Sequence, residues 1–418
     1  MDARTPIEGS GGVVALSASF NLNCDCFIVG TNNGFRLFDA ATCKQLARRA
    51  FRDGGVGLVE IVGRTNIIPL IGGGRKPVQS PLKILVWDEK RERFTREILA
   101  AQPARGLRVL GKKLLVVLEE EVRLYAIDRQ PACEVSFTTT ANPRGLCAVS
   151  RTHFAIPGRI PGHVKVVHNE TQNVSIIPAH ASELAALSLS RDGSLLATAS
   201  EKGTLIRVFL TANNGRVTEL RRGVDQVTIF ALGFNPSGTL LACTSDKGTL
   251  HIFDIPHQTT TTAGDGWTQH GAQRHSAAVP SEVGGDWAYE ESEGGVSFAS
   301  DLRADPTRSG DGRGGGRWGV LGKLPFLPKY FRDTVSFAST EFSMDDGPGG
   351  YRQREVDEAA PMGRARLPRG VLGWPNDNTV VVVGAGVDAK YERFVVSMGN
   401  DGHRTCVRQA WANYLKMD

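Results

Sequence analysis

The sequence predicts an all-β protein, a seven-bladed β-propeller, and three observations support this prediction. The segments GSLLATASEKGTLIRVF (193–209) and GTLLACTSDKGTLHIF (238–253) resemble each other, and their first glycines lie 45 residues apart. A repeat of about 40–45 residues is the period of four-stranded propeller blades. Each segment is an alternating apolar run, a polar turn containing Gly203 or Gly248, and a second alternating run, which is typical of a β-hairpin. Helical periodicity is scarce, and radially stacked blades leave few sheet edges exposed.

The length and composition fit a soluble globular protein with room for a whole propeller. The chain has 418 residues, of which 41% are hydrophobic and 22% charged, and its net charge of +5 suits an anionic partner without demanding one. No run approaches the roughly 18 apolar residues of a membrane span, and the N-terminus lacks the apolar region of a secretory signal. Seven cysteines without framework spacing favour reduced thiols and a cytoplasmic protein. Cys24 and Cys26 are better explained as side chains on one strand face than as metal ligands.

Repeats of this kind divide residues 1–418 into the blades of a single propeller. Weaker copies are FIVGTNNGFRLFD (27–39) and a run that ends in KILVWD (83–88). Seven units are predicted near residues 13–50, 56–100, 105–138, 144–178, 183–223, 224–340 and 363–415.

The sixth unit is far too long for one blade. Residues 256–327 are predicted to be a disordered, flexible insertion within it, because polar Gly-rich sequence such as SGDGRGGGR (309–317) cannot bury enough apolar surface to fold alone. A loop longer than about 15 residues inside a compact domain is usually functional or disordered. A second polar stretch, residues 341–362, is predicted to be a flexible linker between the sixth and seventh blades.

Two adjacent arginines, Arg221 and Arg222 in ELRRG, close the fifth unit on its outermost strand. Neighbouring side chains on a strand point to opposite faces, so the two arginines serve different sites or are simply solvated charges. Each lies beside a hairpin that offers hydroxyls, a basic residue and a glycine turn. In the fifth unit these residues are Thr198, Ser200, Lys202, Thr204 and Arg207. In the sixth unit the matching positions are Cys243, Ser245, Lys247, Thr249 and His251.

Such a pair of pockets suits phosphate, and the chemistry is binding rather than turnover. A guanidinium donates bidentate hydrogen bonds to phosphate oxygens, while hydroxyls and turn N–H groups add neutral donors. The alternative for each Ser or Thr is an ordinary strand-pairing hydroxyl, and for His251 a satisfied strand histidine.

These residues, taken together, resemble the PROPPIN family, the WD-repeat phosphoinositide-interacting propellers that act in autophagy. The resemblance covers nearly the whole chain outside the long insertion, and ELRRG with its flanking blade motifs is its most specific part. Leu220 is similar to the branch with LRRG rather than FRRG. The matching segments are ASEKGTLIRVF (199–209), ELRRG (219–223), KGTLHIF (247–253), NGFRLFD (33–39), GGVGLVEI (54–61), IGGGRKP (71–77), PRGLCAV (143–149), IPAH (177–180) and FLPKYF (326–331).

The resemblance implies two ligands, phosphatidylinositol 3-phosphate and phosphatidylinositol 3,5-bisphosphate. No enzyme activity, cofactor or metal is expected. The residues it implies for a first pocket are Thr198, Ser200, Gly203, Thr204, Arg207 and Arg221, with His180 and Lys202 as possible additions. Those it implies for a second pocket are Arg222, Ser245, Thr249 and His251, with Lys247 as a possible addition. Cys243 is a poor phosphate donor, which leaves the contacts of the second pocket open.

The family also uses its long sixth-blade insertion as a membrane anchor, which implies that residues 256–327 contact the membrane. The inserting side chains would be Trp318, Leu321 and Leu324. From Phe326 onward, packing in the blade core is favoured instead. Two headgroup pockets and an apolar loop would bind together at high effective concentration.

The resemblance further implies a partner, the autophagy bridge-like lipid-transfer protein, bound through the early blades. Candidate contacts are Asn21, Asn23, Arg75 and Lys76. The expected location is cytoplasmic, peripherally associated with phagophore (pre-autophagosomal), endosomal or vacuolar membranes. The main alternative is a generic WD-repeat scaffold that does not bind lipid. A propeller enzyme is disfavoured for want of a catalytic cluster, and a nucleic-acid reader for want of a basic stripe with aromatics.

Overall fold

The computed structural model describes seven stretches of the chain, residues 12–52, 54–127, 132–256, 334–343, 370–386, 389–399 and 402–416. The chain divides into two units, Met1–His257 with Pro328–Asp418, and Gln258–Leu327. The second unit lies wholly outside the described residues. Among the residues that are described, no helix is long and apolar enough to cross a bilayer.

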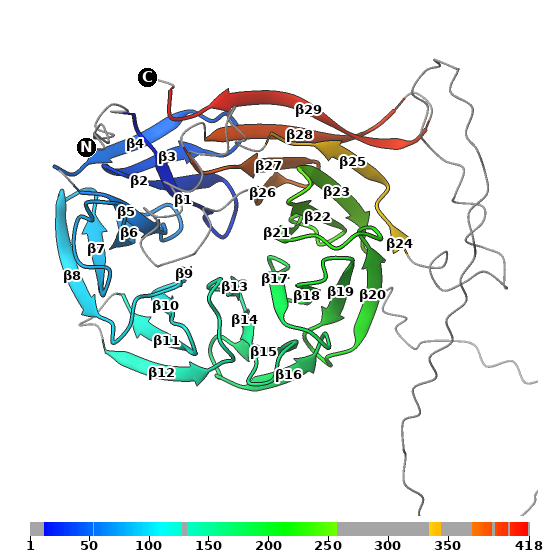
Figure 1. The fold of residues 1–418 in the computed structure, drawn as a ribbon, viewed down its shortest axis with the longest axis horizontal. Helices are drawn as coiled ribbons and strands as arrows, with labels where there is room; N and C mark the ends of the chain where they lie inside the picture. The colour runs from blue at the N-terminus through cyan, green and yellow to red at the C-terminus, as the bar shows by residue number, and fades with distance from the viewer. Residues whose placement is uncertain are drawn as a thin grey trace, which may run out of the picture. The chain divides into compact units, whose positions relative to one another are not determined.

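The first unit is a seven-bladed β-propeller, which confirms the predicted fold class (Figure 1). Blades 1 to 4 are each an antiparallel sheet of consecutive strands, with the innermost strand first in the chain. Blade 1 contains β1 (Ala15–Phe20), β2 (Cys26–Thr31), β3 (Gly34–Asp39) and β4 (Gln45–Ala50). Blade 2 contains β5 (Val56–Val59), β6 (Ile67–Gly72), β7 (Lys83–Asp88) and β8 (Arg93–Leu99). Blade 3 contains β9 (Gly106–Leu110), β10 (Lys113–Val117), β11 (Glu121–Ala126) and β12 (Cys133–Thr138). Blade 4 contains β13 (Ala148–Val149), β14 (His153–Pro157), β15 (His163–His168) and β16 (Val174–Pro178).

Blades 5 to 7 complete the ring. Blades 5 and 6 each receive one strand, β24 and β25, from the segment that follows the long insertion. Blade 5 contains β17 (Leu184–Leu189), β18 (Leu195–Ser200), β19 (Leu205–Leu210), β20 (Arg216–Arg221) and the two-residue β24 (Thr334–Val335). Blade 6 contains β21 (Ile229–Phe234), β22 (Leu240–Ser245), β23 (Thr249–Asp254) and β25 (Ala338–Glu341). Blade 7 contains β26 (Val371–Asn376), β27 (Thr379–Val383), β28 (Lys390–Met398) and β29 (Arg404–Asn413).

β20 is not the outermost strand of blade 5, which corrects the sequence-based expectation. β24 adds to it in parallel, with Leu220 opposite Thr334 and Arg221 opposite Val335. The chain then enters β25, which pairs with β23. Sequence periodicity within blade 5 could not predict this strand, because it lies more than a hundred residues further along the chain.

The polar linker predicted at 341–362 begins inside the blade. Glu341 is the last residue of β25, and Phe342 is buried in the core between blades 6 and 7. The backbone N–H of Ser343 donates to Glu392 Oε1 at 2.6 Å. These contacts fix residues 341–343 to the propeller. Most of the remaining linker lies outside the described residues.

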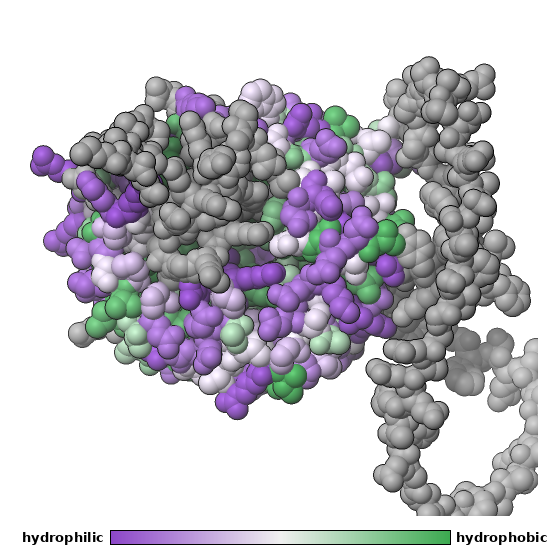
Figure 2. All heavy atoms as spheres, viewed as in Figure 1, coloured by the Kyte–Doolittle hydropathy of each residue, from purple (hydrophilic) through white to green (hydrophobic). Residues whose placement is uncertain are grey.

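Apolar cores lie between neighbouring blades, because middle strands such as β2 and β22 are buried on both faces between the adjacent sheets. Blades 1 and 7 close the ring through such a core, in which Phe27 and Phe38 stack and Tyr414 packs edge-on against both rings. Backbone hydrogen bonds between Ala15 and Gly386, at 3.0 and 2.9 Å, join the same two blades. The innermost strands of all seven blades line a central cavity of about 1470 Å³. On the face drawn in Figure 2, hydrophilic residues predominate and hydrophobic ones form small separate patches.

Candidate functional site

The two hairpins predicted to bind phosphate lie next to each other in blades 5 and 6. Each turns through a glycine with positive φ, +65° at Gly203 and +69° at Gly248. A Cβ on Gly203 would lie 1.9 Å from the carbonyl oxygen of Val227, so only glycine lets this turn approach the connection to blade 6. At the hairpin tips, Lys202 and Lys247 are exposed.

In the first pocket, Thr198 is completely buried and Ser200 nearly so. The Thr198 hydroxyl lies 3.0 Å from His180 Nε2, so the structure brings Thr198 together with a residue of the connection from blade 4 to blade 5. Burial, followed by the nearby Arg207 charge, lowers the pKa of His180 to about 4. The imidazole is therefore neutral at pH 7. It can take part in hydrogen bonds there without adding a positive charge.

Arg207 has a carboxylate partner that the sequence analysis did not include in the pocket. Its Nε donates to Glu219 Oε2 at 2.7 Å, and its NH1 group donates to the Ala179 carbonyl at 2.6 Å. Arg207 and Glu219 are directly opposite each other on β19 and β20. The signal was present in ELRRG, because Glu219 lies two residues before Arg221 and therefore on the same strand face.

Arg221 is the last residue of β20 and is half-buried. It lies between Leu205 on β19 and Val335 on β24. Because Glu219 and Arg221 share a strand face, the Arg221 side chain projects on the side that carries Arg207. Thr204 is half-buried, and its carbonyl accepts a hydrogen bond from the backbone N–H of Arg222 at 3.0 Å.

Arg222 reaches the other way, into blade 6. The NH2 group of its guanidinium donates a hydrogen bond to Ser245 Oγ, with 2.9 Å between the nitrogen and the oxygen. The Ser245 hydroxyl lies 3.3 Å from Thr249 Oγ1. Arg222 Nε is buried and has no hydrogen-bond partner among the described residues. A buried N–H without an acceptor is unfavourable, and an anion beside Ser245 would supply one.

The predicted residue His251 contacts Ser336, a residue of the second pocket that the sequence analysis missed. Its Nδ1 lies 3.1 Å from the hydroxyl of Ser336, which comes from the far side of the long insertion. Burial, and then the charge of Arg222, lowers the pKa of His251 to about 4. Opposite His251 on β22, Cys243 is fully buried and burial raises its thiol pKa to about 12. Cys243 is thus a core thiol and supplies no ligand.

The arrangement offers two cationic groups that diverge from the end of one strand, each beside buried hydroxyls. Such a site can bind anions, since guanidinium and hydroxyl donors suit phosphate oxygens. Among the described residues, no group of three or more His, Cys, Asp or Glu side chains could hold a metal ion.

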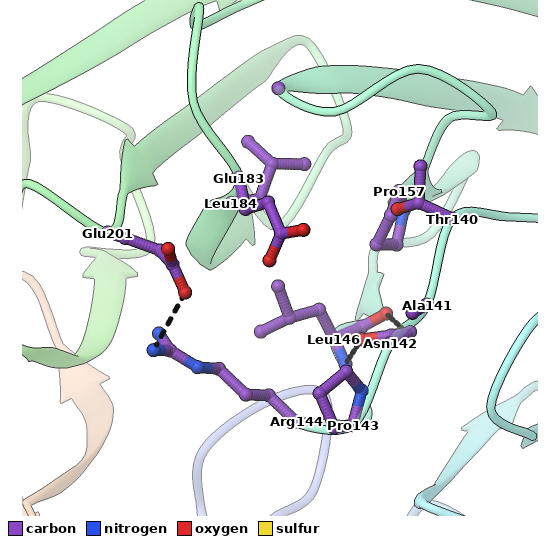
Figure 3. A pocket seen from close by; sticks show the side chains of 11 residues that line it. Thr140, Ala141, Asn142, Pro143, Arg144, Leu146, Pro157, Glu183, Leu184 and Glu201 are labelled. Atoms are coloured by element: carbon purple, nitrogen blue, oxygen red, sulfur yellow. Dashed lines mark hydrogen bonds and ion pairs between the residues drawn. The ribbon is translucent and has the colours of Figure 1, made fainter.

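A small cavity of about 40 Å³ adjoins the first pocket (Figure 3). Arg144, from the connection between blades 3 and 4, points across it toward Glu201, and their side chains lie 3.4 Å apart. Glu201 begins the hairpin turn that contains Gly203. This ion pair therefore links the turn of the first pocket to the PRGL segment at 143–146, although such half-exposed pairs add little stability.

The remaining predicted residues are those proposed to insert into the membrane or to contact a protein partner. The predicted membrane-inserting side chains Trp318, Leu321 and Leu324 lie outside the described residues. Asn21 is buried, and its amide binds Asp25 and the Gly63 carbonyl, so it holds a turn and offers no docking surface. Three other candidate contacts of the early blades are exposed, namely Asn23, Arg75 and Lys76.

Comparisons with known proteins agree with the fold and the motifs. A family model described as PROPPIN matches residues 15–277. The chain is 40% identical to SVP1-like protein 2 of Neurospora crassa, over 99% of each chain. It is 33% identical to Autophagy-related protein 18e of Arabidopsis thaliana, over 59% of this chain and 68% of that protein. The solved structure of Kluyveromyces lactis Hsv2 with its complete loop 6CD has a TM-score of 0.67 at 17% identity, covering 96% of this chain and 99% of that one; at this identity the likeness is one of fold.

Proposed function

The chain belongs to the PROPPIN family, and we propose that it binds phosphatidylinositol 3-phosphate and phosphatidylinositol 3,5-bisphosphate on membranes and recruits autophagy machinery there. The first pocket, around Arg221 in blade 5, binds one headgroup. The second pocket, around Arg222 in blade 6, binds another. The role is that of a binding protein and not of an enzyme.

The observation that carries this proposal is the reach of Arg222. Its guanidinium crosses from blade 5 to Ser245 in blade 6 at 2.9 Å and keeps a buried Nε without an acceptor among the described residues. A solvated surface charge would have neither feature. A phosphate oxygen beside Ser245 and Thr249 would satisfy the Nε–H and gain the hydroxyls as further donors.

With two pockets on one rim, two headgroup contacts that are each weak can together hold the protein on a membrane. Once one headgroup is bound, the second pocket faces a membrane that holds its ligand at high effective concentration. Membrane residence then depends on both arginines together. The long insertion, with Trp318, Leu321 and Leu324, is proposed to add an apolar anchor to the two pockets.

Membrane binding leaves the early blades available to a protein partner. We propose the autophagy bridge-like lipid-transfer protein as that partner, with the exposed Arg75 and Lys76 among the contacts. The protein would then work in the cytoplasm, peripherally bound to phagophore, endosomal or vacuolar membranes. A WD-repeat scaffold without lipid binding is the alternative, and it predicts that the arginine pair is dispensable for membrane binding.

The test is liposome flotation of the wild-type chain and of Arg221→Ala/Arg222→Ala. Vesicles carry no phosphoinositide, the 3-phosphate, the 4-phosphate or the 3,5-bisphosphate, each at low and high salt. We expect the wild type to float only with 3-phosphorylated lipid and the double variant to lose at least about tenfold in affinity, because charged hydrogen bonds contribute about 1.5–3 kcal/mol each. Each single variant should lose only part of the binding.

The matched control removes the same number of charges elsewhere on the surface, with Arg93→Ala/Arg151→Ala in blades 2 and 4. Both residues are exposed. This control should float as the wild type does. If the Arg221/Arg222 variant is folded and still floats like the wild type, the scaffold alternative replaces the proposal.

A further inference from the structure

Two exposed valines flank the arginine pair. The exposed fraction is 64% for Val224 and 61% for Val335, whereas most valines of the described residues are buried. Val224 follows Arg222 by two residues, and Val335 lies directly opposite Arg221 in the parallel pair of β20 and β24. The valine pair thus sits at the rim of blade 5, next to both pockets.

The fold holds Val335 in this exposed position. β24 pairs with β20, the next residue, Ser336, contacts His251 Nδ1 at 3.1 Å, and the backbone N–H of Phe337 donates to the Ile252 carbonyl at 3.0 Å. Successive side chains in an extended segment point to opposite sides. Ser336 turns toward the second pocket, and Val335 therefore turns away from it, toward solvent.

Val224 is held in a comparable way by the connection from blade 5 to blade 6. Backbone hydrogen bonds from Arg222 to Thr204, at 3.0 Å, and from Val227 to Lys202, at 3.3 Å, fix both ends of this arch. Val227 is buried, but residues 224–226 are exposed. An apolar side chain is thus presented on a constrained arch beside Arg222.

We propose that the valine pair is a shallow membrane contact, which enters the interfacial region of the bilayer when the two pockets hold headgroups. This inference rests on the proposed function. Headgroup phosphates lie at the bilayer surface, so side chains on the rim beside a phosphate pocket meet the lipid interface first. The exposed Lys202 and Lys247 beside the pockets suit the same anionic surface, which favours lipid over a protein as the occupant.

The experiment separates headgroup recognition from membrane contact. Val224→Ser/Val335→Ser is compared with the wild type in two assays, flotation with vesicles containing phosphatidylinositol 3-phosphate and calorimetric binding of soluble inositol 1,3-bisphosphate. We expect vesicle affinity to fall about tenfold, since the two exposed valines can no longer bury apolar surface in the bilayer interface, and headgroup affinity to stay unchanged.

A matched control is Val174→Ser/Val407→Ser, whose valines are 47% and 55% exposed on blades 4 and 7. It should leave both assays unchanged. Unaltered flotation of the Val224/Val335 variant would overturn the inference, as would an equal loss in both assays, which would mean a distorted pocket. A protein-docking role would leave both lipid assays intact and so also overturns it. If the wild type binds neither vesicle nor inositol phosphate, the proposed function fails and the inference fails with it.

Discussion

Arg207 illustrates how one side chain can be cationic and yet not fully available to an anion. Its Nε is bound to the Glu219 carboxylate at 2.7 Å, and Arg216 approaches the same carboxylate at 3.4 Å. The Glu219 side chain is only 14% exposed, so solvent screens its charge weakly. In the proposed first pocket, this carboxylate orients Arg207 but also repels a bound phosphate.

We therefore predict that Glu219→Gln tightens headgroup binding in the first pocket. Glutamine keeps an acceptor for Arg207 Nε and removes the negative charge, so affinity for inositol 1,3-bisphosphate should rise about threefold to fivefold, the effect of a partly screened charge pair. Calorimetry in an Arg222→Ala background isolates the first pocket. The same change in an Arg221→Ala background should give no gain, and a weaker affinity in the first background would show that the orienting role dominates.

At the scale of the element, the hairpin between β18 and β19 depends on its glycine. Gly203 has a φ of +65°, and an added Cβ would meet the Val227 carbonyl oxygen at 1.9 Å. Gly238, in the turn between β21 and β22, has a similar φ of +72°, but the nearest atom to an added Cβ is a Leu195 methyl group at 3.6 Å. Both positions require a positive φ, but only at Gly203 is there no space for a Cβ.

We predict that Gly203→Ala destabilises the protein by about 3 kcal/mol or more, and Gly238→Ala by about 1 kcal/mol. The smaller figure is the usual effect of forcing alanine into positive φ, and the larger adds displacement of the connection that follows Arg222. Urea unfolding measures both. Gly203→Ala should also weaken inositol phosphate binding, while Gly238→Ala should not. Equal destabilisation of the two variants would contradict the argument from close approach.

At the scale of the whole molecule, neighbouring blades are joined around the central cavity by polar contacts as well as by apolar cores. Arg108 in blade 3 donates to Glu60 Oε1 of blade 2 at 2.8 Å and to the Cys147 carbonyl, just before blade 4, at 3.2 Å. Glu60 is 5% exposed. Burial raises its pKa to about 7 despite the opposing effect of Arg108.

This raised pKa predicts a pH-dependent stability. The folded chain holds the Glu60 proton up to about pH 7, whereas the unfolded chain releases it near pH 4.5. The stabilising contribution is therefore complete below about pH 4.5 and is lost as the pH rises through 7, a change of about 2 kcal/mol between pH 5 and pH 8. Glu60→Gln mimics the protonated carboxyl. Its melting temperature relative to the wild type should rise from pH 5 to pH 8.

The difference between variant and wild type is the useful quantity, because other groups act in the opposite sense. The pKa values of His180 and His251 are lowered to about 4, so their protonation destabilises the fold as the pH falls from 6.5 toward 4. Glu60→Gln and the wild type share that effect of the histidines, so it cancels in the difference between them. The exposed Glu97, changed to glutamine, is the control and should show no such trend. A pH-independent difference for Glu60→Gln would contradict the prediction.

The sequence by itself determined the fold class, the number of blades and the family, and the bounds predicted for the first four units lie within a few residues of the observed blades. The reason is that blade periodicity, alternation and turn glycines are local patterns that repeat along the chain. The sequence also indicated that Arg221 and Arg222 point to opposite sides of their strand, since neighbouring side chains alternate along a strand.

Only the tertiary structure decided which groups surround those arginines. Glu219 pairs with Arg207 across two strands, and Ser336 reaches His251 from 85 residues away. β24 covers β20 after an even longer separation. The contacts of Ser336 and β24 depend on where the chain returns after a long insertion, and no short-range pattern encodes that position. Spacing in the sequence therefore revealed the arginines, whereas their partners and the exposed valines beside them emerged only once the blades were arranged around the ring.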